Sequence, residues 1–390
     1  MVGGRVYIGD RKSHFYVLDA ATGRLIWQRQ LDTGLSTFCN VDGIVGTAAV
    51  LPDPVTGALT VYVPGAHQMY ALDSANGNIR WQTPIGPATQ SGRGLYFNWA
   101  SPTVAGGRIF MGLAAKCETH LIRGGVVSLD QHTGALLHTY YAVPAGKVGA
   151  SVWSSEASDG ISIWATTGNP DPNGSTIDDS YSVVRLSAST LARQDKWTVP
   201  SAQAADLDFG SSPNLFHGVS GGTTTNLVGA CDKNGFYYAW RQDNLAAGPI
   251  WATRVAGSEV SGAGFCITSA AWDYQALKLF VAAKTNVLGG HAVGGAVREI
   301  DPSTGRVLWQ QPLPCGVTGS PTVNAVTHVL AVVQYKCPAG ATPSVRLFDE
   351  TSGRPVGTIS NGADVFAQPV FAAGQLFIAD DHGNLTAYGP

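Results

Sequence analysis

Short runs of alternating apolar and polar residues extend along the whole chain, and most are rich in β-branched and aromatic side chains. The stretch VYVPGAHQMYALDSANGNIRW, which begins at Val61, contains two such runs and the start of a third. Alternation with a period of two predicts half-buried β-strands. Asp followed by Thr-Gly or Asn-Gly separates the runs and predicts tight turns in which glycine adopts a positive φ. The chain is therefore predicted to be all-β, with short antiparallel strands.

The strand and turn pattern is an internal repeat with the signature D-x3-G-x3-W. Complete copies contain Asp19, Gly23 and Trp27, then Asp73, Gly77 and Trp81, then Asp301, Gly305 and Trp309. Partial copies keep Asp130 with Gly134 and Asp349 with Gly353, and two units without the glycine end at Trp197 and Trp251. Asp19, Asp73 and Asp130 stand 54 and 57 residues apart. This spacing leaves room for about four strands per repeat, which is typical of propeller blades.

The fourth strand of each repeat is expected upstream, at short segments that start at Ser101, Ser212 and Ser320. Four strands per repeat favour a propeller over a solenoid or a sandwich. Counting repeats predicts an eight-bladed β-propeller of four-stranded antiparallel blades, forming a single domain over residues 1–390. The repeated Trp and Gly residues are expected to pack blade against blade, so they indicate fold and not function.

The two ends of the chain are expected to carry incomplete blades. The first blade has almost no innermost strand, and residues 367–388 supply three strands of the eighth blade without an outer one. Because an open strand edge invites pairing with other chains, we expect the natural gene product to be longer at its N-terminus. The extension would hold a secretion signal and a strand that completes the eighth blade, which places the protein outside the cell or in the periplasm.

Composition and charge narrow the function classes. Hydrophobic residues make up 44% of the chain and charged residues only 13%, which fits a globular protein with a large core. With 24 basic and 27 acidic side chains the net charge is −3, so binding to nucleic acid or to an anionic membrane is disfavoured. No apolar run reaches the roughly 18 residues that a membrane span needs.

The six cysteines form no CxxC pair, which excludes zinc-ribbon, thioredoxin-like and c-type haem sites. An even number of cysteines fits an oxidising compartment. Fifteen pairings are possible and the sequence does not choose among them, and buried free thiols remain an alternative.

Four segments that interrupt the repeat carry the candidate chemistry. In chain order they are AAKCETHLIRGG with Glu118 and Arg123, SVWSSEASDGISIWATTGNP with Trp153 and Asn169, DLDFGSSPNLF with Asp208, and ACDKNGFYYAWR with Lys233 and Asn234. Together they resemble the alcohol dehydrogenases that depend on pyrroloquinoline quinone (PQQ), which are eight-bladed propellers. The sequences of these segments are most similar to those of the polyvinyl alcohol dehydrogenase branch.

The resemblance implies a role for each matching residue. Trp153 would form the flat floor beneath the quinone, and Lys233, Asn234 and Arg123 would contact it. Glu118, Asn169 and Asp208 would supply oxygen ligands to calcium, and Asp208 would also be the catalytic base. These residue types suit that chemistry, because a planar quinone stacks on an aromatic ring, Ca²⁺ prefers oxygen ligands, and a carboxylate can accept the proton of an alcohol.

The sequence also departs from the family pattern. Many members have two adjacent cysteines followed by an arginine beside the quinone, whereas this chain has a single Cys39 and no such arginine. In the sixth blade, Cys266 and Ile267 stand where the polyvinyl alcohol branch tends to have Glu and Trp. Gly210 occupies a position that is acidic in lanthanide-using relatives, which favours calcium.

Each candidate also has a structural interpretation. Trp153 could be a core residue, Asn169 an ordinary turn residue, Asp208 a turn cap beside Asp206, and Lys233 a solvated charge. The nine histidines show no metal-ligand spacing such as HxxxH, and His120 and His291 are expected in surface loops.

Three functions remain open. The main hypothesis is a PQQ- and calcium-dependent dehydrogenase of a polymeric or secondary alcohol. It would pass electrons to an external acceptor such as a cytochrome c, because the chain has no haem-attachment motif. The alternative is a propeller without catalysis that acts as a binding or scaffold module. A lyase or hydrolase is a third option, but no Ser, His and Asp combination can be assembled from local motifs.

Overall fold

The computed structural model describes residues 1–32, 43–86, 96–117, 121–174, 176–200, 206–258 and 264–389. Contacts within the chain divide it into two units, Met1–Pro200 and Ser201–Pro390, which are described separately below. Two residues that the sequence analysis singled out lie outside the described residues. They are Glu118, the predicted calcium ligand, and Cys39, which stands where the family pattern has two adjacent cysteines. Among the described residues, no helix has the length and apolar character that crossing a membrane would require.

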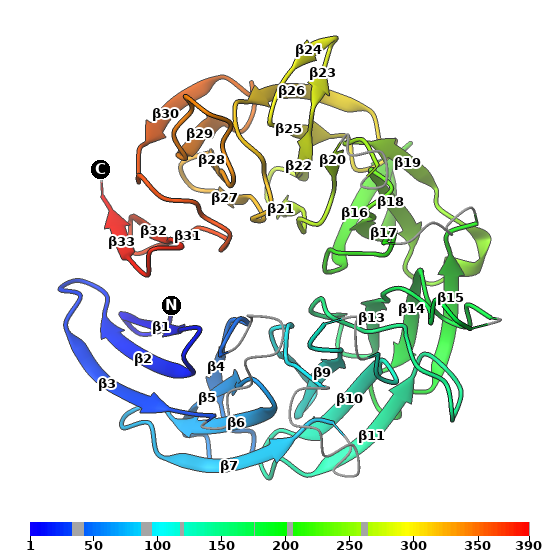
Figure 1. Cartoon of the computed structure of the whole chain (residues 1–390), viewed down its shortest axis with the longest axis vertical. Coiled ribbons are helices and arrows are strands. Elements are labelled where there is room, and N and C mark those ends of the chain that lie inside the picture. Colours follow the sequence, from blue (N-terminus) through cyan, green and yellow to red (C-terminus); the bar gives the residue numbers. More distant parts are fainter. Residues whose placement is uncertain are drawn as a thin grey trace. The chain divides into compact units, whose positions relative to one another are not determined.

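Unit 1 consists of four antiparallel sheets that follow one another along the chain, and we call them blades one to four (Figure 1). Blade one has strands β1 (Arg5–Gly9), β2 (His14–Asp19) and β3 (Leu25–Gln30), and blade two has β4 (Ala49–Pro52), β5 (Leu59–Pro64), β6 (Gln68–Asp73) and β7 (Ile79–Pro84). Blade three has β8 (Thr103–Ala105), β9 (Arg108–Leu113), β10 (Gly125–Asp130) and β11 (Leu136–Tyr141). Blade four has β12 (Ala157–Ser158), β13 (Ser162–Thr166), β14 (Ser182–Ser187) and β15 (Arg193–Thr198).

Unit 2 continues the series with blades five to eight. Blade five has β16 (Asn214–Ser220), β17 (Thr223–Cys231), β18 (Phe236–Arg241) and β19 (Trp251–Arg254), with a 3-10 helix at Leu245–Ala247. Blade six has β20 (Gly264–Phe265), β21 (Ala271–Asp273), β22 (Lys278–Thr285), β25 (Gly295–Ile300) and β26 (Val307–Leu313), with a hairpin of β23 (Val287–Leu288) and β24 (His291–Ala292). Blade seven has β27 (Thr322–Asn324), β28 (Val329–Val333), β29 (Val345–Asp349) and β30 (Pro355–Ile359), and blade eight has β31 (Val370–Ala372), β32 (Gln375–Ala379) and β33 (Leu385–Tyr388).

The strand counts agree with the expectation at both ends of the series. Within the described residues, blade one pairs as β1-β2-β3 and blade eight as β31-β32-β33, so each has three strands. Blade six departs from the four-strand pattern, because β20 and β21 both pair with β22.

The D-x3-G turn forms because the aspartate organises the backbone around it. Asp19 accepts hydrogen bonds from the backbone N–H and the hydroxyl of Thr22 at 2.9 and 2.7 Å, and Gly23 donates its N–H to the Asp19 carbonyl. Gly23 has a φ of +70°, a conformation that costs a side-chain-bearing residue energy. The turn is therefore encoded locally, which explains why it could be identified from sequence.

The repeated tryptophan docks onto the glycine turn of the next blade. Trp27 donates its indole N–H to the Ser74 carbonyl, and a Cβ on Gly77 would lie 2.7 Å from the Trp27 ring. The other ring and glycine pairs are Trp81 with Gly134, Trp251 with Gly305, and Trp309 with Gly353. Glycine is required at these positions both by its positive φ and by the close approach of the indole.

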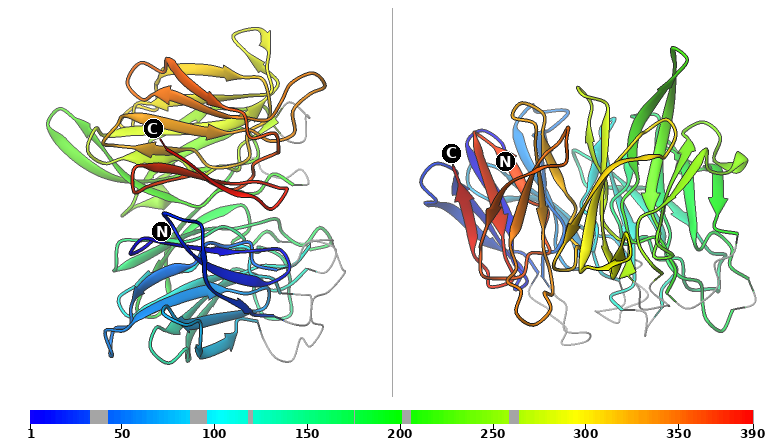
Figure 2. Two further views of the ribbon diagram at one scale, coloured as in Figure 1. Left: turned by 90° about the vertical axis from the view of Figure 1, so that its left-hand side faces the viewer. Right: turned by 90° about the horizontal axis from the view of Figure 1, so that it is seen from above.

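Successive blades within each unit pack face against face (Figure 2). Val61 and Val63 of β5 pack against blade one, and Tyr62 between them packs against blade three. All three side chains are fully buried. The prediction of half-buried strands is therefore wrong for β5 and for the equivalent β9, because a neighbouring blade covers each face. Both faces of β5 and of β9 therefore belong to the core, so the second strand of these blades is almost continuously buried.

A serine at the start of four innermost segments links the segment to the preceding blade. Ser101 Oγ accepts from the backbone N–H of Thr47, and Ser155 Oγ accepts from the N–H of Ser101, at 2.8 and 2.9 Å. In unit 2, Ser269 and Ser320 accept in the same way from Ser212 and Ser269. Side-chain acceptors thus satisfy backbone donors that no sheet partner reaches.

Candidate functional site

Asp208 and Lys233 stand on two segments that run side by side at one end of blade five. Phe209 and Asp232 form an isolated antiparallel bridge, and the Lys233 N–H donates to the Asp208 carbonyl at 3.1 Å. Ser211 fixes the first segment further, because its hydroxyl accepts from the N–H of Cys231 at 2.7 Å. The local pairing therefore joins two predicted site residues that are 25 positions apart in sequence.

The Lys233 ammonium forms ion pairs with two carboxylates. Its Nζ lies 2.8 Å from Asp208 Oδ1 and also contacts Asp206 Oδ1. Asp208 is 2% exposed, whereas Asp206 is half-exposed and has a φ of +62°. Burial alone would lower the pKa of Lys233, but Asp208 and Asp206 raise it above its ordinary value. Lys233 therefore remains a cation at neutral pH.

Asp232 is a second buried carboxylate beside this ion pair. Its Oδ1 accepts from the N–H of Asn234 at 2.8 Å, and its Oδ2 is buried without a hydrogen-bond partner among the described residues. Burial raises the pKa of Asp232 to about 8, and the negative charge of Asp208 adds to the effect. Asp208 and Asp232 together offer buried carboxyl oxygens, which are the type of ligand that a hard divalent cation takes.

Asn234 makes the turn that follows. Its side-chain carbonyl accepts from the N–H of Phe236 at 3.0 Å, and its amide donates to the Tyr238 hydroxyl at 2.9 Å. Tyr238 stacks on Trp240, with ring centroids 5.6 Å apart, and Phe209 meets both rings edge-on. This aromatic packing holds the Asp208 and Lys233 segments in place.

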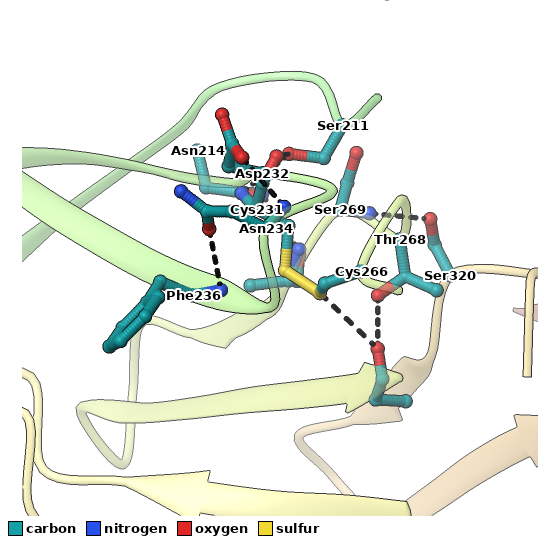
Figure 3. Close-up of a disulfide and its surroundings, with 12 residues drawn as sticks. Ser211, Asn214, Cys231, Asp232, Asn234, Phe236, Cys266, Thr268, Ser269 and Ser320 are labelled. Carbon is teal, nitrogen blue, oxygen red and sulfur yellow. Dashed lines mark hydrogen bonds between the residues drawn. A yellow bond between two sulfur atoms is a disulfide. The ribbon is translucent and has the colours of Figure 1, made fainter. Parts of the chain in front are cut away.

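A disulfide between Cys231, the residue before Asp232, and Cys266 joins blade five to blade six (Figure 3). Asn214 reinforces the junction, because its side chain both donates to and accepts from the backbone of Ala270 at 2.9 and 2.8 Å. A second disulfide joins Cys315 to Cys337, and Cys117 is also disulfide-bonded. The structure therefore selects disulfides over the alternative of buried free thiols at these positions.

In unit 1, the segments that carry Arg123, Trp153 and Asn169 converge on Gly149. Gly149 bridges Arg123 on one side and Pro170 on the other, and the Ala150 N–H donates to the Asn169 carbonyl at 2.7 Å. Gly149 has a φ of +107°, and a Cβ there would lie 2.7 Å from the Asp171 nitrogen. Trp153 and Asn169 are half-buried. Their segments adjoin as the order of the motifs suggests.

Arg123 has a set of contacts that is structural in character. Its guanidinium carbon lies 3.8 Å from the Tyr141 ring centroid, and its Nε donates to the Val143 carbonyl at 2.8 Å. The arginine thereby fastens the segment before β10 to the end of β11. These contacts engage one face and one donor of the guanidinium, which has further donors.

Glu156 is a buried carboxyl group that sequence reasoning missed. It stands directly before β12, is 5% exposed, and neither carboxyl oxygen has a hydrogen-bond partner among the described residues. Burial raises the pKa of Glu156 to about 8. The segment SSEAS occupies the place of SPTV in blade three, so an acidic residue where other blades have proline was the available signal.

Residues 1–160 match a family model for PQQ-like repeats that is described as outer membrane protein assembly factor BamB. No curated protein matches the chain. Among solved structures, quinohemoprotein alcohol dehydrogenase from Comamonas testosteroni is similar with a TM-score of 0.73 and 17% identity, covering 97% of this chain and 69% of that chain.

Two further structures are similar along almost the whole chain. A europium-containing methanol dehydrogenase has a TM-score of 0.75 and 15% identity, covering 97% of this chain and 81% of that chain. BamB from Moraxella catarrhalis has a TM-score of 0.62 and 13% identity, covering 100% of this chain and 92% of that chain. At these identities the similarity establishes the fold, and the predicted all-β eight-bladed propeller class is confirmed.

Proposed function

We propose that this chain is an oxidoreductase that oxidises a secondary or polymeric alcohol with PQQ and calcium. It would pass the electrons to an external acceptor, such as a cytochrome c, in the periplasm or outside the cell. The buried ion pair of Asp208 with Lys233, 2.8 Å apart, is the observation that carries the proposal. It places a carboxylate that can accept the hydroxyl proton beside a cation that can stabilise negative charge.

The residues of unit 2 fit the two groups that the proposal needs. Asp208 and Asp232 are almost fully buried and offer hard oxygen donors, and Asp232 Oδ2 lacks a hydrogen-bond partner among the described residues. A calcium ion would satisfy that oxygen and would favour the ionised form of Asp232. Lys233 offers N–H donors for carbonyl oxygen atoms.

The chemistry divides among the groups as follows. When bound, the quinone would accept the two electrons of the oxidation and calcium would polarise nearby oxygen atoms. Asp208 would accept the proton of the substrate hydroxyl at a carboxylate oxygen. Lys233, whose raised pKa keeps it protonated, would donate hydrogen bonds to the oxygen on which negative charge grows. Low exposure of Asp208 would exclude competing water from this step.

The roles proposed for the remaining residues rest on the family resemblance. Trp153 would provide the flat apolar face for the quinone, and Asn169 and Glu118 would add calcium ligands. Asn234 and Arg123 would contribute donors to the quinone. Asn234 and Arg123 also form hydrogen bonds that stabilise the local backbone.

The experiment is a titration of PQQ into the metal-depleted protein with and without calcium, followed by quinone absorbance and by dye-linked oxidation of alcohols. We expect saturable binding that requires calcium, together with turnover. Absence of both binding and turnover at saturating calcium would overturn the proposal.

A scaffold function is the second candidate, favoured by the match of residues 1–160 to the BamB family model. In that case the Asp208, Asp232 and Lys233 group would serve only to hold blade five together. The same titration distinguishes the two functions, because a scaffold would bind no PQQ and would oxidise no alcohol.

A further inference from the structure

Three ligand-type side chains meet between blades six and seven, away from the site described above. Asp273 ends β21 of blade six, and His328 and Glu350 lie in two turns of blade seven. One donor atom from each residue lies within 4.8 Å of the other two. Two of the three residues are almost completely buried: Asp273 is 1% exposed and Glu350 0%.

The hydrogen bonds of the cluster leave two carboxylate oxygens unsatisfied. Asp273 Oδ1 accepts from the N–H groups of Gln275 and Ala276, whereas its buried Oδ2 has no hydrogen-bond partner among the described residues. Glu350 Oε1 lies 2.7 Å from His328 Nδ1, whereas its buried Oε2 has no hydrogen-bond partner in the described part of the chain. Buried oxygens of this kind cost free energy unless a cation or a donor satisfies them.

The charges around the cluster do not supply that cation. Within the described part of the chain, neither Asp273 nor Glu350 forms an ion pair with a lysine or an arginine. The ammonium of Lys278 donates to the Thr351 hydroxyl at 2.9 Å and approaches the backbone carbonyl of Glu350 at 3.4 Å. Burial raises the pKa of Glu299, and the positive charge of Lys278 opposes that rise.

At the equivalent place between blades two and three, protein groups alone satisfy the carboxylate of Asp53. Asp53 occupies the turn position of Asp273, and the His132 ring nitrogen lies 3.1 and 3.0 Å from its two oxygens. Burial would raise the pKa of Asp53, but hydrogen bonds from Thr56 and His132 lower it to about 2. That pair holds one carboxylate and one imidazole, whereas the blade six and seven cluster adds the second carboxylate of Glu350.

We propose that Asp273, His328 and Glu350 bind a first-row divalent transition metal ion that clamps blade six to blade seven. One imidazole with two carboxylates is a donor set for Zn²⁺ or Mn²⁺, whereas Ca²⁺ takes oxygen ligands. Zinc bonds of about 2.0–2.2 Å place tetrahedral donors about 3.3–3.6 Å apart, so donor atoms that lie within 4.8 Å of one another need to shift by about 1.5 Å at most. The His328 side chain is 58% exposed, so an ion and a water ligand can reach the fourth position from solvent.

Zinc binding to untagged protein stripped with a chelator tests the proposal. We expect one Zn²⁺ per chain by calorimetry and a rise in the unfolding temperature with zinc concentration. His328 has a φ of +55°, and glycine precedes the strand equivalent to β28 in blades one, three, five and eight, namely Gly4, Gly107, Gly222 and Gly374. His328→Gly should therefore fold well, and it should weaken zinc binding at least 10-fold.

Glu350→Gln should weaken binding to a similar extent, and His132→Ala is the matched control that should leave it unchanged. Calcium in large excess should not displace the zinc. The proposal is overturned if the wild-type chain binds no stoichiometric zinc, or if zinc binding survives both His328→Gly and Glu350→Gln. PQQ binding should be the same in His328→Gly as in wild type, so this result is independent of the proposed dehydrogenase function.

Discussion

The Trp309 indole N–H donates to the backbone carbonyl of Glu350, 3.2 Å away. Glu350 therefore belongs both to the packing contact that recurs between blades and to the cluster proposed to bind a metal. The backbone serves the first role and the carboxylate the second. Packing thus fixes one proposed ligand before any ion arrives, which lowers the ordering cost of binding.

Substitution of a docking glycine should destabilise the blade contact. Gly134→Ala would place a Cβ 2.5 Å from the Trp81 ring in addition to straining a φ of +73°. Gly23 has the same turn position and a φ of +70°, but its Cβ would meet nothing within 4 Å. We expect Gly23→Ala to cost about 1–2 kcal/mol of unfolding free energy, and Gly134→Ala about 1–3 kcal/mol more. Urea unfolding of both variants measures the difference, and equal losses would contradict the docking contact.

The stability of the protein should fall as pH rises because of Glu156. Its pKa is about 8 in the folded chain and 4.5 ordinarily, so between these values the folded state holds a proton that the unfolded state has released. Each such proton lowers stability by about 1.4 kcal/mol per pH unit. Glu156→Gln should match the wild type near pH 5 and become progressively more stable than it towards pH 8. Chemical unfolding across this range tests the sign, and parallel curves would exclude the buried carboxyl as the cause.

Removal of the proposed base should abolish turnover and retain the cofactor. Asp208→Asn keeps the shape of the side chain but cannot accept the hydroxyl proton, so we expect the rate of dye-linked alcohol oxidation to fall at least 100-fold. Absorbance should still report bound PQQ. Asp243→Asn is the control, because Asp243 is exposed and pairs with Arg241 on the same blade. Undiminished turnover in Asp208→Asn would remove Asp208 from the mechanism.

The disulfide between Cys231 and Cys266 should contribute substantially to the stability of unit 2. Cys231 and Cys266 are 35 positions apart, and joining them restricts the unfolded chain. Replacing both with serine should lower the free energy of unfolding by about 2–4 kcal/mol. The same change at Cys315 and Cys337, which are 22 positions apart, serves as the comparison and should cost slightly less. A double variant at Cys231 and Cys266 with wild-type stability would contradict this expectation.

The parts of the structure that sequence could predict are those encoded by neighbouring residues. The turn at Asp19 and Gly23 closes on itself through local hydrogen bonds, so repeating it predicted eight blades. Burial is different, because it depends on what covers a residue. The orphaned carboxyl of Glu156 and the raised pKa of Asp232 arise from neighbours that no local pattern indicates.

Contacts between blades that lie outside the repeated Trp and Gly pattern were the least predictable. Asp273, His328 and Glu350 show no metal-binding spacing, since they come from three turns of two blades. One signal was present in the repeat itself. Glu350 follows the turn aspartate at a position where the other four repeats have Ala20, Ser74, Gln131 and Pro302. A charged residue where the other repeats have uncharged ones indicates that the contact at that blade does something more than pack.

The contact of tryptophan with glycine has a direction. In every described case the tryptophan comes from the earlier blade and the glycine from the later one, as with Trp27 and Gly77. The face of a blade that carries the tryptophan therefore fits the face of the next blade that carries the glycine, whereas two like faces cannot form this contact. A blade copied by gene duplication would find its matching surface already present on its neighbour, so blade number can change without a new contact. A fragment cut between two blades would instead expose unlike surfaces, which favour open head-to-tail chains over two-fold dimers.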